Sequence, residues 1–489
     1  MTAGRSPAVL FFALQAEKQC KRSAPNLESQ QFVGLQNPMK IFLAALALAF
    51  FLAPSPAGDA RNAAPLTGTP VLEVLFPPSD SHGRNYDDVK TYLLRKDSPA
   101  FPLISGAVIQ VAWSDFDLGD AKSGTHTKYD FKLVDDAIAP WIAAGKFANL
   151  VISTTPYGAP PRCPERGSGS NGQSGVGNCA MPAWMWTALG ESNFTNCDGA
   201  QVPNFISNAY VTNYQAAMAA LIQHYASTPG VGYIRVGLGK GGEINLPKGW
   251  QEPDESCGQA YTKRWGYTVG DSNKSTWNAY LEKMLNFEGG LHSTKQLMVS
   301  ITPVRAPGVN PQEVSDFIAP IAVKNGIGFG NQGLSTMAMH DCTGMQADWC
   351  KLFERFKGKV PLQLQTLGPS CPQGSCGGGQ GQGQGQRRGQ GGWGQGQGQG
   401  GRWGGQGGGP GQGRWGQGRV QGGGGGMLGS LSNMTGSLVP LLPFATKYHA
   451  TILEIYTEDW LIAFSPNHPQ NRQYGSDYAQ ALKQTAEGK

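Results

Sequence analysis

AVIQVAW (Ala107–Trp113), FKLVDDAIAPWIAA (Phe131–Ala144) and ANLVIST (Ala148–Thr154) are the segments of this sequence that decide its expected fold. The first and third are short apolar runs rich in β-branched residues, which is typical of buried strands. The second has apolar residues at helical spacing, as expected for a helix with one face on a core. A strand, a helix and a second strand in this order predict a βαβ unit with parallel strands.

Eight strand-like runs of this kind follow one another along the chain. They are Val71–Phe76, Ala107–Trp113, Ala148–Thr154, Gly232–Leu238, Gln296–Thr302, Leu334–His340, Val360–Thr366 and Ala450–Tyr456. Helical patterns separate most of them, at Phe131–Ala144, Val211–Tyr225, Ser275–Phe287, Pro311–Lys324 and Trp349–Phe356. Eight strands with helices between them predict an α/β fold, a (β/α)8 TIM barrel with long βα loops. An open doubly wound sheet is the alternative, but it would usually carry a glycine fingerprint where this chain has Pro77 and Pro78.

Glycine is concentrated in one segment. The chain has 489 residues and 70 glycines, and 29 of the 53 residues from Gly374 to Gly426 are glycine. We predict a disordered, low-complexity Gly/Gln/Arg-rich loop inserted after the seventh strand. A tolerated repeat expansion with no role is the favoured interpretation, and the alternative is a contact of its arginines and tryptophans with a glycan or a cell wall.

The net charge of +5 comes from two segments of the chain and not from the remainder. The segment Gly374–Gly426 contributes five arginines and no acid, and the first 38 residues contribute +2, so the remainder has a net charge of −2. A slightly acidic body has no electrostatic surface for a polyphosphate, and we expect no nucleic-acid partner.

The segment MKIFLAALALAFFLAPSPAGDA (Met39–Ala60) has the layout of a signal peptide. Its apolar run is shorter than the roughly 20 residues that span a bilayer, so we expect cleavage near Ala57 or Ala60 and no membrane contact afterwards. Residues 1–38 then lie upstream of the true start, as a non-native extension or a long leader. Residues 61–489 are expected to form a single catalytic-type domain, secreted to the extracellular space or the periplasm.

Eight cysteines follow Met39, and an even number in an exported protein suits disulfides. Cys342 with Cys350 and Cys371 with Cys376 are plausible local pairs, although connectivity does not follow from sequence. No CxxC pair or closely spaced histidine pair occurs, so we predict no metal and no other cofactor. The oligomeric state does not follow from the sequence.

Two glutamates are the candidate catalytic residues. Reactive side chains of such a barrel lie where strands end and the following loops begin. Glu243 follows the fourth strand and the glycine-rich run GLGKGG, and Glu454 lies between two apolar residues of the eighth strand. Paired carboxylates carry out glycoside hydrolysis, one donating a proton and the other attacking or activating water. The alternatives are purely structural roles: a helix cap for Glu243, and for Glu454 an internal salt bridge with Arg235 or Arg305.

Other side chains near the strand ends are candidates for binding a carbohydrate substrate by stacking and hydrogen bonds. They are Trp113, Asp115, Tyr157, Trp250, Arg305, His340, Asp341, Gln365, Tyr456 and Trp460. His340 and Asp341 are assigned to the end of the sixth strand. Trp460 either lines a sugar subsite or packs in the core, and the adjacent Asp459 is expected to be a solvated loop acid.

GAVIQVAWSDFD (Gly106–Asp117) and YIRVGLGKGGE (Tyr233–Glu243) resemble the barrel glycoside hydrolases of clan A. The likeness covers the second to fourth strands. It implies a TIM barrel and an O-glycosyl hydrolase whose proton donor, at the end of the fourth strand, is Glu243. Gly242 stands where the family pattern has asparagine. The segment GLGKGGEINLP is also similar to the proton-donor segment of β-amylases.

The seventh strand departs from that family pattern. The family nucleophile stands at its end, where this chain has Gln363 and Gln365 in VPLQLQTLGPS and no carboxylate. Three explanations follow: the strand count is off by one, the second carboxylate has moved to Glu454, or the retaining chemistry is absent. We therefore predict a secreted glycosidase of unknown linkage. The alternative is a catalytically reduced barrel that binds polysaccharide or cell-wall glycan.

Overall fold

The computed structural model describes part of the chain, and the account below concerns that part. It comprises residues 65–66, 68–76, 86–154, 180–190, 193–195, 201–239, 242–244, 263, 265–266, 275–301, 312–334, 347–370 and 436–488. The upstream extension, the proposed signal peptide and the glycine-rich segment lie outside these ranges, so the predictions made for them stay predictions.

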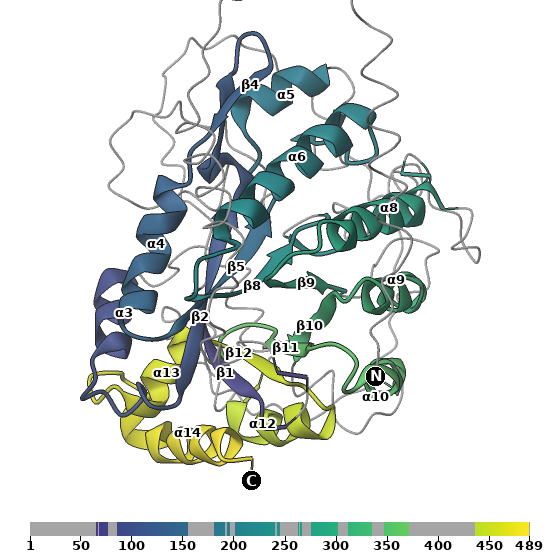
Figure 1. Ribbon diagram of the computed structural model, residues 1–489. Coiled ribbons are helices and arrows are strands. Elements are labelled where there is room, and N and C mark those ends of the chain that lie inside the picture. The colour runs from purple at the N-terminus through teal and green to yellow at the C-terminus, as the bar shows by residue number, and fades with distance from the viewer. Residues whose placement is uncertain are drawn as a thin grey trace, which may run out of the picture. The chain divides into compact units, whose positions relative to one another are not determined.

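Eight parallel strands close into a barrel (Figure 1). In order around the barrel they are β1 (Val71–Leu75), β2 (Ile104–Ala112), β5 (Phe147–Ser153), β8 (Val231–Val236), β9 (Gln296–Ser300), β10 (Gly328–Leu334), β11 (Leu362–Thr366) and β12 (Ile452–Tyr456). β12 pairs again with β1, in a register that sets Glu73 opposite Glu454. The predicted (β/α)8 barrel is confirmed.

Helices connect successive strands and surround the barrel (Figure 1). They are α3 (Tyr86–Leu94), α4 (Lys132–Ala143), α5 (Ala183–Leu189), α6 (Asn208–Tyr225), α8 (Thr276–Gly290), α9 (Glu313–Lys324), α10 (Ala347–Phe356), α12 (Leu438–Lys447), α13 (Thr457–Phe464) and α14 (Asn471–Ala486). Serine caps fix two of these starts: Ser207 accepts from the Tyr210 amide at 3.2 Å, and Ser275 from the Asn278 amide at 3.4 Å.

Short elements decorate the loops. A 3-10 turn, η1 (Trp113–Asp115), follows β2, and the hairpin of β3 (Asp117–Asp120) and β4 (Thr125–Tyr129) comes next. A second small hairpin joins β6 (Phe194–Thr195) to β7 (Gln201–Val202).

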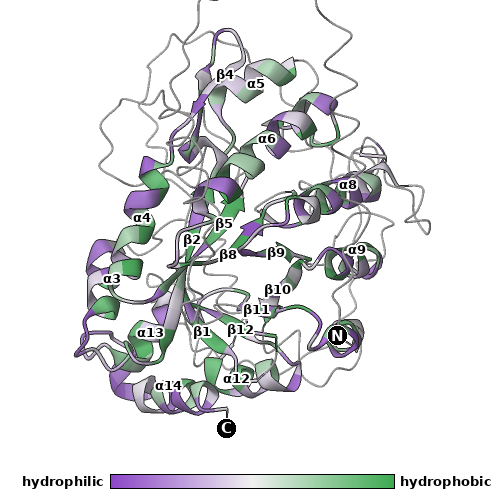
Figure 2. Ribbon diagram, in the orientation of Figure 1, coloured by the Kyte–Doolittle hydropathy of each residue, from purple (hydrophilic) through white to green (hydrophobic). Residues whose placement is uncertain are grey.

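Hydropathy follows this architecture. In Figure 2 the helices mix hydrophobic and hydrophilic residues along their length, as expected when one face packs on the barrel and the other meets water. Within the described ranges, no helix is both long and apolar enough to span a bilayer.

The barrel interior has a polar level between two apolar ones. One apolar cluster contains Tyr233, Met298 and Ile452, and another contains Leu75, Val108, Val151 and Tyr456. Alternate residues of a strand point to the same side, so Glu454 faces inward between Ile452 and Tyr456. A charged side chain therefore lies in the middle of the barrel.

The sixth strand is not where the sequence predicted it. It runs from Gly328 to Leu334, whereas the prediction placed it at Leu334–His340. Its sequence GFGNQGL is glycine-rich and reads as a turn, but the packing requires a small residue: a Cβ on Gly330 would lie 1.8 Å from the Gln363 amide oxygen. His340 and Asp341, which the prediction placed at the end of this strand, lie outside the described residues, so their assignment stays a prediction.

Candidate functional site

Glu243 lies at the carboxyl end of the barrel. After β8 the chain returns to the sheet, where Glu243 forms an isolated parallel bridge with Ser300, the last residue of β9. The Ile244 amide donates to the Ser300 carbonyl at 3.1 Å, which anchors the segment. Glu243 is buried, with 5% of its surface exposed. This is the end of the barrel at which active sites of this fold are built.

Gly242, which stands where the resembled glycoside hydrolases have asparagine, packs tightly against the sheet. It has φ +79°, and a Cβ there would lie 2.9 Å from the Ile152 carbonyl oxygen of β5. Asparagine tolerates a positive φ, but it could not occupy this space without moving the strand. The tight approach brings Glu243 onto the barrel rim.

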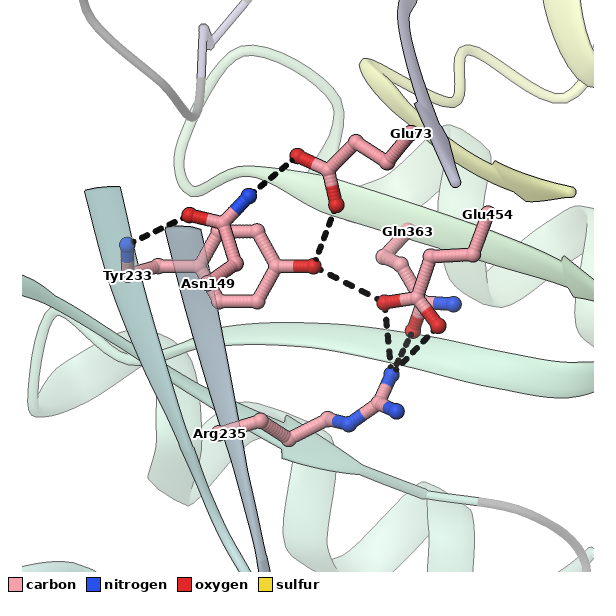
Figure 3. A network of polar contacts seen from close by, with 6 residues as sticks. All are labelled: Glu73, Asn149, Tyr233, Arg235, Gln363 and Glu454. Atoms are coloured by element: carbon pink, nitrogen blue, oxygen red, sulfur yellow. Dashed lines mark hydrogen bonds and ion pairs between the residues drawn. The ribbon is translucent and has the colours of Figure 1, made fainter. Parts of the chain in front are cut away.

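Arg235 and Glu454 form an ion pair inside the barrel (Figure 3). Nη1 of Arg235 donates to Oε1 and Oε2 of Glu454 at 2.8 and 3.0 Å, and to the amide oxygen of Gln363 at 3.2 Å. All three side chains are buried. The internal salt bridge that was considered as a purely structural role for Glu454 is thus present, and Arg235 is the partner of Glu454.

Glu73, Asn149 and Tyr233 extend this group into a network that crosses the barrel (Figure 3). The Tyr233 hydroxyl lies 2.6 Å from Oε2 of Glu73 and 2.9 Å from Oε1 of Glu454. Asn149 donates to Oε1 of Glu73 at 2.6 Å and accepts from the Tyr233 backbone amide at 3.0 Å. Strands β1, β5, β8, β11 and β12 all contribute, so barrel closure assembles the network.

The two candidate catalytic glutamates share their surroundings. Burial disfavours the charge of Arg235, but its pKa is raised overall by Glu454 and, more weakly, by Glu243. Burial, Glu454 and Glu243 also raise the pKa of Tyr456, whose side chain is hydrogen-bonded to Gln365. Both carboxylates therefore act on the same arginine and the same tyrosine.

Tyr456 and Gln365 lie beside the network, towards the carboxyl ends of β12 and β11. Tyr456 is the last residue of β12, and Gln365 pairs in register with Glu454; each is 8% exposed. Both had been predicted as substrate-binding residues. Their place beside the charged pair is compatible with that prediction.

Two of the predicted sugar-binding tryptophans, Trp113 and Trp460, pack in the core. Trp113 has no exposed surface, donates from Nε1 to Asp117 at 2.8 Å and makes edge contacts with Trp184, Tyr210 and Tyr214. Trp460 of α13 is equally enclosed. Neither ring offers a face to a ligand in this structure. Core packing, the alternative considered for Trp460, describes both.

Two acidic residues near the strand ends hold the backbone. Asp115 accepts a hydrogen bond from the Ala112 amide at 2.9 Å and so closes the turn after β2. Asp459 is buried, not a solvated loop acid, because α13 begins directly after β12. It accepts from the Ser370 amide at 3.0 Å and also from the Ser370 hydroxyl. Burial raises the pKa of Asp459 to about 7.

Three further predicted residues, Tyr157, Trp250 and Arg305, lie outside the described residues. Among the side chains that are described, no group of three or more His, Cys, Asp or Glu is arranged to hold a metal ion. Cys350 is disulfide-bonded, and its partner and the other cysteines lie outside the described part of the chain.

The position of strand β11 tests whether the predicted strand count was off by one. It is the seventh barrel strand, as predicted, and it carries Gln363 and Gln365. A miscounted strand therefore does not explain the missing carboxylate. The explanations that remain are a second carboxylate at Glu454 and the absence of the retaining chemistry.

Sequence reasoning missed Glu73, Asn149 and Tyr233. Glu73 stands at the centre of VLEVL, an otherwise apolar strand, and so carried the signal that had identified Glu454. Tyr233 and Asn149 carried no such signal. A tyrosine or an asparagine in a strand is ordinary, and its partners come from distant strands.

Comparison with known proteins finds likeness in structure only. No family model matches the sequence, and no curated protein matches it significantly. The chain is similar to the catalytic domain of the β-amylase from Paenibacillus polymyxa, with 12% identity and a TM-score of 0.41, over 62% of this chain and 88% of that one.

Two other solved structures are more distant. The β-galactosidase from Bacillus circulans sp. alkalophilus has 13% identity and a TM-score of 0.37, over 63% of this chain and 46% of that one, so the likeness spans less than half of that enzyme. The intracellular xylanase from Thermoanaerobacterium saccharolyticum has 12% identity and a TM-score of 0.31, over 61% and 72%. These structures are of glycosidases, and likeness at this level carries no argument about the activity of this chain.

Proposed function

We propose that this protein is a glycoside hydrolase acting on a poly- or oligosaccharide, with Glu243 as proton donor and Glu454 as the second carboxylate. The observation that carries the proposal is the shared environment of the two side chains. Arg235, in the barrel interior, is bonded to Glu454 and interacts electrostatically with Glu243, which lies at the carboxyl end of the barrel. Glycoside hydrolysis needs two carboxylates on one site, in different protonation states.

The assignment of roles follows from the hydrogen bonds of Glu454 and the position of Glu243. Glu454 accepts two hydrogen bonds from Arg235 and one from Tyr233, which favours its ionised form. Glu243 lies at the end of the fourth barrel strand, the position of the proton donor in the glycoside hydrolases that the sequence resembles. We therefore assign the transferable proton to Glu243.

The first test is Glu243→Gln. The variant should keep the fold and lower turnover by at least about 10²-fold, because the amide cannot donate the proton as a carboxylic acid does. Reducing-sugar release by the purified full chain from soluble starch, xylan and β-glucan measures it. Glu282→Gln, an exposed glutamate of α8, is the matched control. Turnover equal to that of the parent would remove Glu243 from the reaction.

The role of Glu454 has its own test. Glu454→Ala should be inactive, and sodium azide should restore turnover of an activated aryl glycoside if the ionised carboxylate attacks or activates the nucleophile. A glycosyl azide product would support that role. A variant that folds by circular dichroism and retains parental activity would contradict it.

One observation favours the second function, a barrel that binds polysaccharide without cleaving it. Strand β11 has glutamines at both inward positions, and Glu454 is enclosed by its hydrogen-bond partners. Retention of the parent on insoluble xylan or cellulose, with no reducing ends released from any tested glycan, would select this function over the first.

We also propose that the protein is exported by the segment Met39–Ala60, on the strength of its signal-peptide layout. Expression from Met39 in a secreting host should deliver a chain that begins near Gly58 or Arg61 to the medium, as read by N-terminal sequencing. Retention of the uncleaved chain in the cells would contradict export.

A further inference from the structure

One hydroxyl proton serves two carboxylates at the centre of the barrel. The Tyr233 oxygen lies 2.6 Å from Glu73 and 2.9 Å from Glu454, and both distances are those of hydrogen bonds (Figure 3). A tyrosine hydroxyl donates only one hydrogen bond, and an ionised carboxylate donates none. Two ionised carboxylates would therefore leave one of these oxygen pairs without a proton between them. One of the glutamates must carry its own proton.

Arg235 identifies which glutamate stays charged. Its Nη1 contacts both oxygens of Glu454, whereas its effect on Glu73 acts only through space. Glu73 makes no ion pair among the described side chains. A buried carboxylate bonded to a guanidinium keeps its charge, and one without a bonded cation favours the neutral form. The proton therefore belongs to Glu73.

Asn149 identifies the oxygen that carries this proton. A backbone amide only donates, so the Asn149 atom that faces the Tyr233 amide must be its oxygen. Its NH₂ group then donates to Oε1 of Glu73. Oε1 is occupied as an acceptor, which leaves Oε2, 2.6 Å from the tyrosine oxygen, as the protonated atom.

The surroundings agree with this count of protons. Burial and the charge of Glu454 raise the pKa of Glu73 well above its usual range. Burial, Glu454 and Glu73 also raise the pKa of Tyr233, so the hydroxyl keeps the proton that it donates. The ionisable groups that act on this pair are Glu454 and Arg235, and Glu243 acts on Arg235 from the rim.

We propose that Glu73 is a neutral carboxylic acid and a positioning residue for Glu454: its O–H donates to Tyr233, and the Tyr233 O–H donates to Glu454. The chain of donors runs in one direction and ends on the charged carboxylate. Glu454 is thereby held from two sides, by Tyr233 and by Arg235. The consequence for turnover rests on the proposed function, whereas the protonation of Glu73 does not.

Infrared difference spectroscopy tests the protonation directly. Subtracting the Glu73→Gln spectrum from that of the parent at neutral pH should leave the carbonyl stretch of a protonated carboxyl group. The matched Glu454→Gln variant should instead remove carboxylate bands. Carboxylate bands in the Glu73→Gln difference would overturn the proposal, whether or not the protein is an enzyme.

Unfolding equilibria across pH give a second, independent readout. The folded pKa of Glu73 is raised, so its contribution to stability is complete below the unfolded pKa, near 4.5, and is lost as the pH rises towards the folded pKa. Relative to the parent, Glu73→Gln should therefore gain about tenfold in its folding equilibrium constant per pH unit above 4.5. A difference that does not change with pH would mean that Glu73 is ionised, against the proposal.

Kinetics tests the positioning role on whichever glycan is cleaved. Tyr233→Phe should lower kcat by roughly tenfold to a hundredfold with little change in KM, because Glu454 loses a hydrogen bond to a charged group. Glu73→Gln should retain kcat, since its amide can donate to Tyr233 and its oxygen can accept from Asn149. Equal losses in both variants would overturn the positioning role. If the parent protein has no activity, the proposed function is contradicted, but the infrared and unfolding experiments still test the protonation of Glu73.

Discussion

Buried glutamates in the barrel interior and in the layer between α6 and α8 differ in the hydrogen bonding of their carboxyl groups. In the barrel, the carboxyl groups of Glu73 and Glu454 are joined to Tyr233 and Arg235 by short hydrogen bonds. On α8, both oxygens of Glu288 are buried, and neither has a hydrogen-bond partner among the residues that the structure describes. Its surroundings are aromatic and include Tyr214 and Tyr280.

This difference shows how a bonded cation changes the charge state that a buried carboxyl group favours. Arg235 lets Glu454 stay charged, although desolvation of the pair makes its net stabilisation small. Glu288 has no bonded cation among the described side chains, and burial raises its pKa to about 8. Of these two carboxyl groups, the one in the barrel is bonded to a guanidinium, and the one in the helix layer favours its neutral form because its pKa is raised.

Removing the cation should have the largest effect. Arg235→Met leaves the charge of Glu454 buried and unpaired, and we expect a loss of about 3–5 kcal/mol in the free energy of unfolding. Guanidinium denaturation at neutral pH measures it. Arg472→Met, at an exposed arginine of α14, is the control and should be nearly neutral.

The double variant Arg235→Met with Glu454→Leu sharpens this result. It removes both charges, so it should recover much of the stability that the single variant loses. A single-variant loss below about 1 kcal/mol would contradict the comparison, since it would mean that Glu454 needs no cation in the barrel.

Glu288→Gln should have an intermediate effect that depends on pH. The folded pKa near 8 lies above the usual 4.5, so the stability contributed by the neutral acid is complete below pH 4.5 and is lost as the pH rises towards 8. The variant should match the parent at low pH and gain about 1.4 kcal/mol per pH unit at most within that interval. Thermal or urea unfolding from pH 4 to pH 9 measures it, with Glu282→Gln as control. A constant difference would mean that Glu288 is ionised and has an unrecognised partner.

Gly330→Ala should have the smallest effect. The new Cβ would meet the amide of Gln363, which must move away from Arg235, and we expect a loss of about 1–3 kcal/mol. Gly290→Ala is the matched control, because a Cβ there meets nothing within 4 Å. If both variants unfold at the same denaturant concentration, the space around Gln363 is not limiting.

Local patterns predicted most of the fold. Seven of the eight strands were found near their predicted positions because apolar, β-branched runs bounded by turns identify buried strands without knowledge of their partners. The sixth failed for a specific reason. GFGNQGL reads as a turn, and only the closed barrel shows that Met298 and Gln363 leave no room for larger residues at Gly328 and Gly330.

The candidate site was predicted in part. Glu243 and Glu454 were identified by their positions at and within strands, and Arg235 was named as a partner for an internal salt bridge. Trp113 and Asp459 were assigned to ligand and solvent, but both are buried. A strand end indicates only where the backbone leaves the barrel, and the packing of the next loop or helix decides what covers the side chain.

The sequence by itself determined the order of strands and helices, since each element is encoded by local periodicity. It also determined which strands carry a charge in an apolar run, as VLEVL and ILEIY do. Only the tertiary structure decided that Glu73, Tyr233 and Glu454 meet around one proton. Along the chain, Tyr233 is 160 residues from Glu73 and 221 residues from Glu454. Barrel closure brings the three side chains to the same level. The protonation of a buried acid depends on such non-local partners, which no local pattern specifies.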